Sequence, residues 1–287
     1  MDFLSIVLGG CAAGMVLFIV SVGLSVTMGL MGFINLAHGG FAMLGGYVIV
    51  LAMKHWGLGF VAALALAFVA VAALSVVLER LLYARLYRAA ELTQVLFTIG
   101  LAFVMTAAVT LVVGPETQVV PLPAWLRGQT DLGFLQYRTY SLVLIVVGVV
   151  LVIGLWLGFE RTRFGARIRA AVDNRRMVSS LGVDVNRLFT VTFAVGSGLA
   201  ALGGGLGAEI LGLDPNYPLR YLVYFLIVVA VGGLGRVTGV FVAALLIGTL
   251  DFVLKIYFPK GGTIFIYALT LALLLWRPQG LFGRRGP

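Results

Sequence analysis

The sequence predicts an all-α, polytopic bundle of eight or nine membrane segments, and three observations lead to this fold class. Hydrophobic residues make up 61% of the 287 positions and charged residues 11%. In soluble domains about 45 to 50% of residues are apolar and about 25% are charged. The apolar residues gather in runs near the length of about 20 residues that crosses a bilayer core. The 38 glycines suit helices whose backbones approach closely. We expect one membrane domain over residues 1–287.

The expected segments follow one another with short connections. In chain order they are 3–29, 39–53, 58–78, 92–113, 139–159, 188–211, 221–234, 237–258 and 263–276. The first is too long for the apolar core of a cleaved signal peptide, so it predicts a retained span. The second, seventh and ninth are short for a full crossing. We therefore expect short or broken helices, which persist at membrane depth only where protein or a water-filled cavity surrounds them.

Arginine placement predicts the orientation. Most basic residues fall in three segments: 79–91, 160–187 and the tail after Trp276. The positive-inside rule places all three in the cytoplasm. The loop 114–138 is then external, the N-terminus lies outside and the C-terminus is cytoplasmic. Membrane topology thus accounts for the net charge of +9 without a nucleic-acid partner.

The segment 160–187 is the most informative of the three. It carries seven arginines and no span of its own. Apolar residues at helical spacing are Ile168, Ala171, Val172 and Leu181, which predicts an amphipathic surface helix. Gly182 is placed to end a helix, and Asp173 or Asn174 to cap a short one. The residues leave two interpretations open: a helix docked in a partner's groove, or one lying on anionic lipid head groups.

Four blocks occur in a fixed order along nearly the whole chain: 29–47, 162–204, 232–239 and 276–282. Together they resemble the permeases of branched-chain amino acid ABC transporters. The length and the start of the chain resemble the LivH-type subunit of that family rather than the longer LivM-type partner.

The resemblance implies a subunit that moves leucine, isoleucine and valine across the bacterial inner membrane. Its implied partners are a LivM-type permease, two cytoplasmic ABC ATPases and a periplasmic or extracellular binding protein. The residues to which it assigns ATPase coupling are Arg169, Asp173, Asn174, Arg175, Arg176, Ser179 and Gly182. The chain has no Gly-x-x-x-x-Gly-Lys-Ser/Thr loop, so we expect no ATPase site, no enzyme activity and no cofactor.

Two glycine-rich breaks interrupt apolar sequence, one in each half of the chain. The translocation-path candidates in them are Asn35, His38, Gly39, Gly40, Gly232, Gly233 and Gly235. Paired breaks of this kind indicate a substrate path, but close packing of small residues explains them equally well. Polar groups at membrane depth favour a function. For His38, with no acidic residue near it, hydrogen-bonded packing is favoured over a proton relay.

Few acidic residues lie within the apolar segments. Glu209 is expected to face a vestibule or to pair with Arg220, and Asp251 to pair with Lys255 four residues on. Two histidines and one cysteine offer no convincing metal site. Two alternatives remain open: an ABC permease for urea, short amides or another small solute, and a secondary transporter or channel that works without an ATPase.

Overall fold

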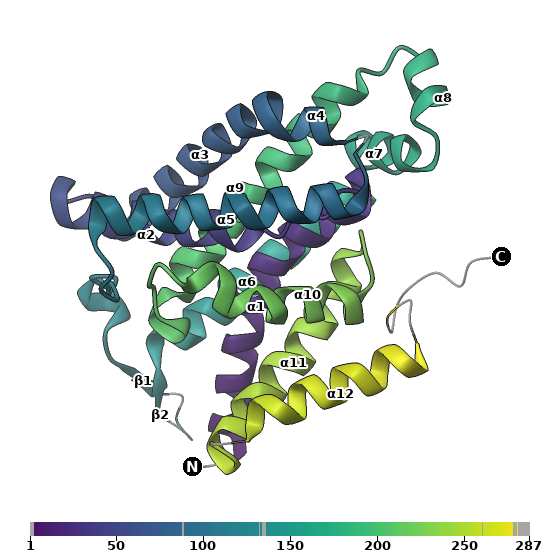
Figure 1. The fold of residues 1–287 in the computed structure, drawn as a ribbon. Helices are drawn as coiled ribbons and strands as arrows, with labels where there is room; N and C mark the ends of the chain where they lie inside the picture. Colours follow the sequence, from purple (N-terminus) through teal and green to yellow (C-terminus); the bar gives the residue numbers. More distant parts are fainter. Residues whose placement is uncertain are drawn as a thin grey trace.

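The computed structural model is a helical bundle with one small hairpin, and it describes residues 3–87, 89–131, 133, 136–259, 261–277 and 280 (Figure 1). The α-helices are α1 (Phe3–Met31), α2 (His38–Trp56), α3 (Phe60–Leu78), α4 (Ala84–Leu86), α5 (Glu91–Val113), α6 (Thr139–Glu160), α7 (Arg163–Asp173), α8 (Arg175–Ser180), α9 (Val185–Leu211), α10 (Tyr217–Gly232), α11 (Val237–Tyr257) and α12 (Gly262–Trp276). A π-helix, η1 (Glu79–Tyr83), joins α3 to α4. The all-α membrane bundle is thereby confirmed.

Within the described residues, six helices are long and apolar enough to cross a membrane. They are Phe3–Gly29 in α1, Phe60–Leu86 from α3 to α4, Glu91–Val113 in α5, Thr139–Phe159 in α6, Val185–Leu211 in α9 and Val237–Tyr257 in α11. Tyr217–Gly232 and Ile264–Trp276 are shorter apolar helices. The expected short segments therefore exist as helices α2, α10 and α12.

Two boundaries differ from the sequence-based expectation. The 79–91 segment was expected to be a loop, but η1 and α4 continue the helix of α3 as far as Leu86. In the loop 114–138 the chain forms a 3₁₀ turn, η2 (Ala124–Leu126), and two antiparallel strands, β1 (Gln129–Asp131) and β2 (Gln136–Arg138), with Gln129 opposite Arg138.

The centre of the bundle is built on α1 and α9. Helix α1 packs along α9 and α11, and α9 also packs along α2 and α3. Helices α5, α6 and α12 lie at the periphery and expose large apolar side chains such as Leu111, Val150 and Leu275. An apolar exterior of this kind is the surface that a bundle presents to lipid.

Glycines let the central helices touch through their backbones. A methyl group at Gly204 of α9 would overlap the backbone carbonyl of Ala42 in α2. A methyl group at Gly248 of α11 would likewise overlap the backbone of Gly14 in α1. These contacts are close small-residue packing, which was one of the two open interpretations of the glycine-rich sequence.

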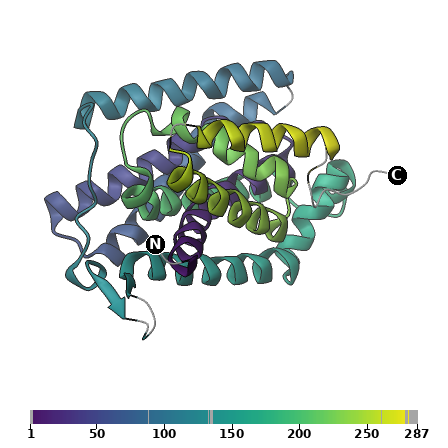
Figure 2. The ribbon, with the colours of Figure 1, turned by 90° about the horizontal axis from the view of Figure 1, so that it is seen from below.

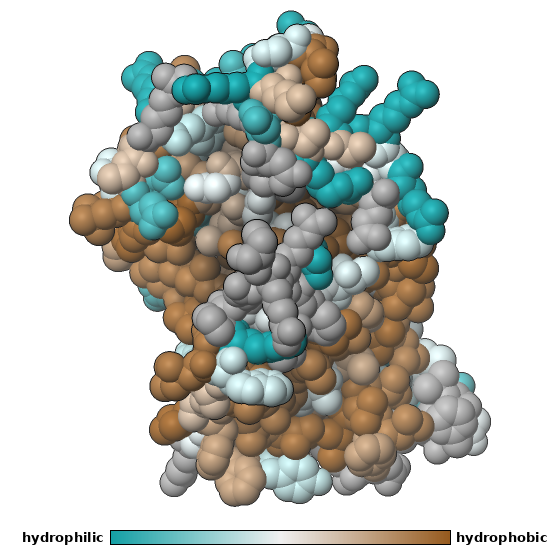
Figure 3. Space-filling view, turned by 90° about the vertical axis from the view of Figure 1, so that its right-hand side faces the viewer, coloured by the Kyte–Doolittle hydropathy of each residue, from teal (hydrophilic) through white to brown (hydrophobic). Residues whose placement is uncertain are grey.

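The two ends of the bundle differ in character. The β-hairpin, the start of α1 and the start of α12 lie at one end, and α4, α7 and α8 lie at the other (Figures 1 and 2). Figure 3 shows hydrophilic side chains along one rim above a broad hydrophobic band. Arg80, Arg85 and Arg187 line one cavity, so the 79–91 and 160–187 segments share an end. We call it the arginine-bearing end.

We predict that Gly204→Ala destabilises the protein, because the new methyl group forces α9 away from α2. Overpacking of this kind costs about 1 to 3 kcal/mol. Thermal unfolding of the purified chain in detergent should show a lowered midpoint. Gly154→Ala in α6 is the matched control, since nothing lies within 4 Å of a methyl group there. Equal midpoints for the two variants would contradict this packing.

Candidate functional site

The first break, residues 32–37 between α1 and α2, is held by side chains of other helices. Gly32 has a φ of +60°, a backbone conformation that favours glycine. The Ile34 N–H donates to Oε1 of Gln94 (3.3 Å), and the Ile34 carbonyl accepts from the hydroxyl of Thr98 (3.4 Å). Both partners lie in the first turns of α5, so the break is located toward the arginine-bearing end. Its Ile34 backbone groups are satisfied within the protein, as apolar surroundings require.

Asn35 and His38 are both fully buried. Oδ1 of Asn35 accepts a hydrogen bond from the hydroxyl of Tyr83 (3.0 Å), and Nε2 of His38 lies 3.0 Å from the carbonyl oxygen of Val20. Nδ2 of Asn35 and Nδ1 of His38 form no hydrogen bond with the residues that the structure describes. Each side chain thus links the break to a neighbouring helix, and one polar atom of each has no hydrogen-bond partner among the described residues.

The second break, residues 233–236 between α10 and α11, lies against the last turns of α1. Gly233 and Gly235 have φ values of +86° and +71°. The Gly235 N–H donates to the hydroxyl and the carbonyl of Ser25 in α1 (3.0 and 3.2 Å), and a methyl group at Gly29 would overlap Gly235. The second break therefore packs against the last turns of α1, directly before the first break.

The remaining glycine candidates are packing positions in this conformation. A methyl group at Gly39 would press on Pro218 of α10, and one at Gly40 would overlap the sulfur of Met105 in α5. Gly232 lies against the backbone of Val240. Whether these glycines also line a substrate path stays a prediction.

The π-helix η1 carries residues that the sequence analysis missed. Glu79 is 3% exposed; its Oε1 accepts from the hydroxyl of Tyr87 (2.6 Å) and its Oε2 from that of Thr190 in α9 (2.8 Å). Four residues on, Tyr83 reaches Asn35. The π-turn presents both side chains to the bundle, and such turns often occur at functional sites. The helical spacing of Glu79, Tyr83 and Tyr87 could have revealed these residues, but the 79–91 segment was interpreted as a loop.

The 160–187 segment folds as two short helices with well-formed ends. Oδ1 of Asn174 accepts the Met177 N–H (3.0 Å) and caps α8. At the other end Gly182, with a φ of +81°, donates to the Ser179 carbonyl (3.0 Å), and Val183 to that of Val178 (3.4 Å). This pair of bonds is a Schellman motif. The predicted cap at Asn174 and helix end at Gly182 are both confirmed.

The exposed surface of this segment differs from the expected apolar stripe. Ile168 and Ala171 are buried as expected, but Leu181 is 75% exposed, because the turn at Gly182 directs it outward and Val178 takes the buried position. Met177 is 64% exposed beside it. The tip of α8 therefore presents two large apolar side chains, a surface typical of a protein contact.

The other coupling candidates lie on α7 and α8. Arg169 donates to the carbonyl of Phe159, and Arg176 and Ser179 are exposed. The side chains of Asp173 and Arg175 lie outside the described part of the chain, as do Arg88, Arg284, Arg285 and most of the 276–282 block.

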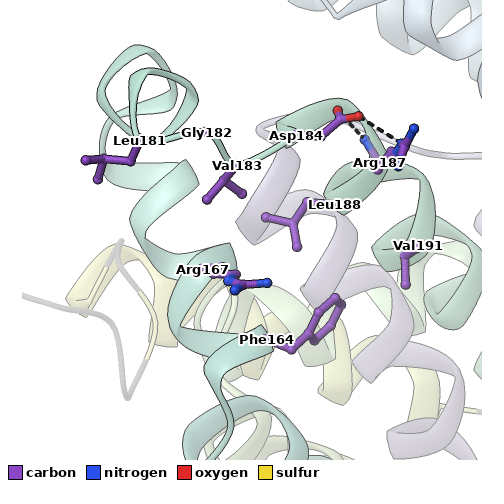
Figure 4. A pocket seen from close by; sticks show the side chains of 9 residues that line it. All are labelled: Phe164, Arg167, Leu181, Gly182, Val183, Asp184, Arg187, Leu188 and Val191. Atoms are coloured by element: carbon purple, nitrogen blue, oxygen red, sulfur yellow. Dashed lines mark hydrogen bonds and ion pairs between the residues drawn. The ribbon is translucent and has the colours of Figure 1, made fainter.

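A cavity of about 410 Å³ lies between α7 and the start of α9 (Figure 4). Phe164 and Arg167 of α7 face Leu188 and Val191 of α9 across it, whereas Leu181 points away. Arg187 pairs with Asp184 at its rim (3.0 Å). The groove thus has apolar walls and charged edges.

The ion pairs correct one expectation and confirm another. Glu209 pairs with Arg138 of β2 (2.9 Å) rather than with Arg220. Arg138 can reach Glu209 because the hairpin lies beside the end of α9. Arg220 instead forms an ion pair with Asp214 (2.6 Å) in the loop before α10. The expected pair of Asp251 with Lys255 is present at 2.7 Å. Among the described residues no cluster of histidine, cysteine and acidic side chains could hold a metal ion.

Comparison with known proteins gives one consistent family. Residues 6–274 match the family model described as the permease component of branched-chain amino acid transport systems. BraD of Pseudomonas aeruginosa, a high-affinity branched-chain amino acid permease protein, is 25% identical over 98% of this chain and 96% of its own. LivH of Escherichia coli is 26% identical with the same coverage, and LivM of Escherichia coli is 24% identical over 95% of this chain and 69% of its own. No solved structure gives a significant match.

We predict that Tyr83→Phe destabilises the first break, because it leaves the buried Oδ1 of Asn35 without its donor. Stranding a buried polar atom costs about 1 to 3 kcal/mol. The thermal unfolding midpoint in detergent should fall. Tyr257→Phe serves as the control, because Tyr257 is exposed at the end of α11. The hydrogen bond would be shown unimportant if both variants unfold like the parent protein.

Proposed function

The chain belongs to the family of permease components of branched-chain amino acid transport systems, and from this premise we propose that it forms half of the translocation channel of an ABC importer for leucine, isoleucine and valine. A LivM-type permease supplies the other half in this proposal, since LivH-type and LivM-type relatives both match the chain. Two cytoplasmic ATPases and an external binding protein complete the complex. The chain itself has no phosphate-binding loop and hydrolyses no ATP.

We propose a multi-pass topology in the bacterial inner membrane, with residues 1–287 as one domain. Segment 160–187 is cytoplasmic and loop 114–138 is external, because basic residues remain on the cytoplasmic side. The location of these segments at opposite ends of the bundle supports this orientation. An external N-terminus and a cytoplasmic C-terminus require an odd number of crossings. Among the residues that the structure describes, nine matches the six long apolar helices and the shorter α10 and α12, together with α2.

The observation that carries the coupling role is the projecting α8 tip. Met177 and Leu181 are apolar, exposed and set among arginines, so they suit a cleft in a protein partner better than the solvent. Helix α9 begins at Val185, directly after the tip, and packs along α1, α2 and α3. A displacement of the tip by an ATPase is therefore passed to the centre of the bundle.

The two alternatives predict different behaviour. A permease for urea or short amides would use the same machinery with another solute. An ATPase-independent transporter driven by protons would need free intramembrane carboxylates. The observation against it is that Glu209 and Asp251 are both engaged in ion pairs, and that both oxygens of the buried Glu79 accept hydrogen bonds.

We predict that Gly182→Ala uncouples the ATPases, because a residue with a side chain is strained by about 1 to 2 kcal/mol at this φ. The Schellman turn then reorients the α8 tip. Reconstituted complexes should lose most of the substrate-stimulated ATP hydrolysis, while the chain still inserts in the membrane. Gly57→Ala introduces similar strain (φ +61°) at the opposite end and should hydrolyse ATP normally. Normal stimulated hydrolysis in Gly182→Ala would refute the coupling role.

We predict ATP-dependent leucine uptake by proteoliposomes that contain both permeases, both ATPases and the binding protein. Labelled leucine, isoleucine and valine should accumulate, and labelled urea and acetamide should not. Leaving out the ATPases should abolish uptake. Uphill transport without them would support the secondary transporter, and urea uptake with them would change only the substrate.

A further inference from the structure

A second cavity at the arginine-bearing end shares only Arg187 with the groove beside α7, and neither the α8 tip nor the glycine-rich breaks line it. It has a volume of about 530 Å³ and lies between η1, α4 and the first turns of α9. Three arginines from these three elements line it: Arg80, Arg85 and Arg187. Three arginines that line one hollow give it a positive potential, which attracts anions.

The only carboxylate among the cavity's lining residues is already engaged. Glu79 is buried, and its two oxygens accept hydrogen bonds from Tyr87 and Thr190. Arg187 additionally pairs with Asp184 outside this cavity. Positive charge therefore predominates in the cavity, and the guanidinium group is the side chain that best matches the paired oxygens of a phosphate.

An apolar strip leads from the lipid-facing side of the bundle to this cavity. Leu74, Val77 and Leu81 follow one another at spacings of three and four residues along α3 and η1, so they share a helix face. All three are exposed. Because a turn of the π-helix takes more residues than an α-helical turn, Arg85, four residues after Leu81, continues this face, and it lines the cavity. A long apolar strip that ends at a basic hollow is the complement of a phospholipid with its acyl chains below its phosphate.

We propose that this cavity binds the phosphodiester head group of an anionic phospholipid of the phosphatidylglycerol class, with an acyl chain along Leu74, Val77 and Leu81. A zwitterionic lipid fits less well, since its own cation meets three arginines. Free phosphate makes no use of the apolar strip. Basic pockets between membrane helices on the cytoplasmic side commonly hold such head groups.

The test measures lipid retention by the full-length chain without its proposed ATPases, so it does not depend on the proposed function. The protein is purified from nanodiscs of mixed phosphatidylglycerol and phosphatidylcholine, and bound lipid is measured by native mass spectrometry. The parent chain should retain phosphatidylglycerol preferentially. The double variant Arg80→Gln/Arg85→Gln should retain it about 25-fold less, because each basic residue at the membrane surface contributes a factor of about five.

Two further variants separate a specific site from general charge and from misfolding. Arg163→Gln/Arg176→Gln removes two exposed arginines from the same end that do not line the cavity, and it should retain the lipid like the parent. Glu79→Gln removes the negative charge from the cavity wall and should strengthen retention several-fold. Opposite effects of the two cavity variants cannot both come from a loss of fold.

Three outcomes would overturn the proposal. The first is equal loss of phosphatidylglycerol in both double arginine variants. The second is displacement of the lipid by inorganic phosphate as readily as by added phosphatidylglycerol. The third is unchanged lipid retention by Arg80→Gln/Arg85→Gln together with loss of ATPase subunits from the complex, which would make the cavity a protein-docking surface.

Discussion

The constraint on which this structure depends is that a backbone N–H or C=O in apolar surroundings must find its partner within the protein. Uninterrupted helices meet it by themselves, but each break creates new donors and acceptors. Gln94 and Thr98 satisfy Ile34, and Ser25 satisfies Gly235. Each of these bonds joins helices that are distant in sequence. The breaks therefore hold the bundle together at the points where its helices stop.

Further side-chain hydrogen bonds connect the π-helix η1 to the first break and to the central helix α9. Tyr83 joins η1 to the first break through Asn35, and Glu79, one turn earlier, joins η1 to α9 through Thr190. Helix α9 begins at the α8 tip and continues through the centre of the molecule. In the proposed complex, a partner that moved the tip would act on η1 through α9 and on the first break through Tyr83 and Asn35.

Local features were predictable from the sequence, and tertiary ones were not. The apolar runs predicted the helices. The cap at Asn174 and the turn at Gly182 follow from the chemistry of those residues alone. The exposure of Leu181, by contrast, depends on the direction in which the chain leaves a turn. The partner of Glu209 depends on where a hairpin folds. The role of Glu79 was hidden because arginines next to it are typical of a loop, while its own partners lie on α9 and in the turn after α4.

Burial of the path candidates bears on how a solute could pass. Asn35 and His38 are fully enclosed, and Gly39 and Gly40 are covered by Pro218 and Met105. If these residues line a path, α2 must separate from α10 or α5 to open it. Glycine contacts suit such a movement, because surfaces without side chains do not interlock and can part or slide at little steric cost. Nδ2 of Asn35 and Nδ1 of His38 make no hydrogen bond with the described residues, so separation would offer them to a solute without breaking a bond. In that case close packing and a substrate path would be two states of the same glycines.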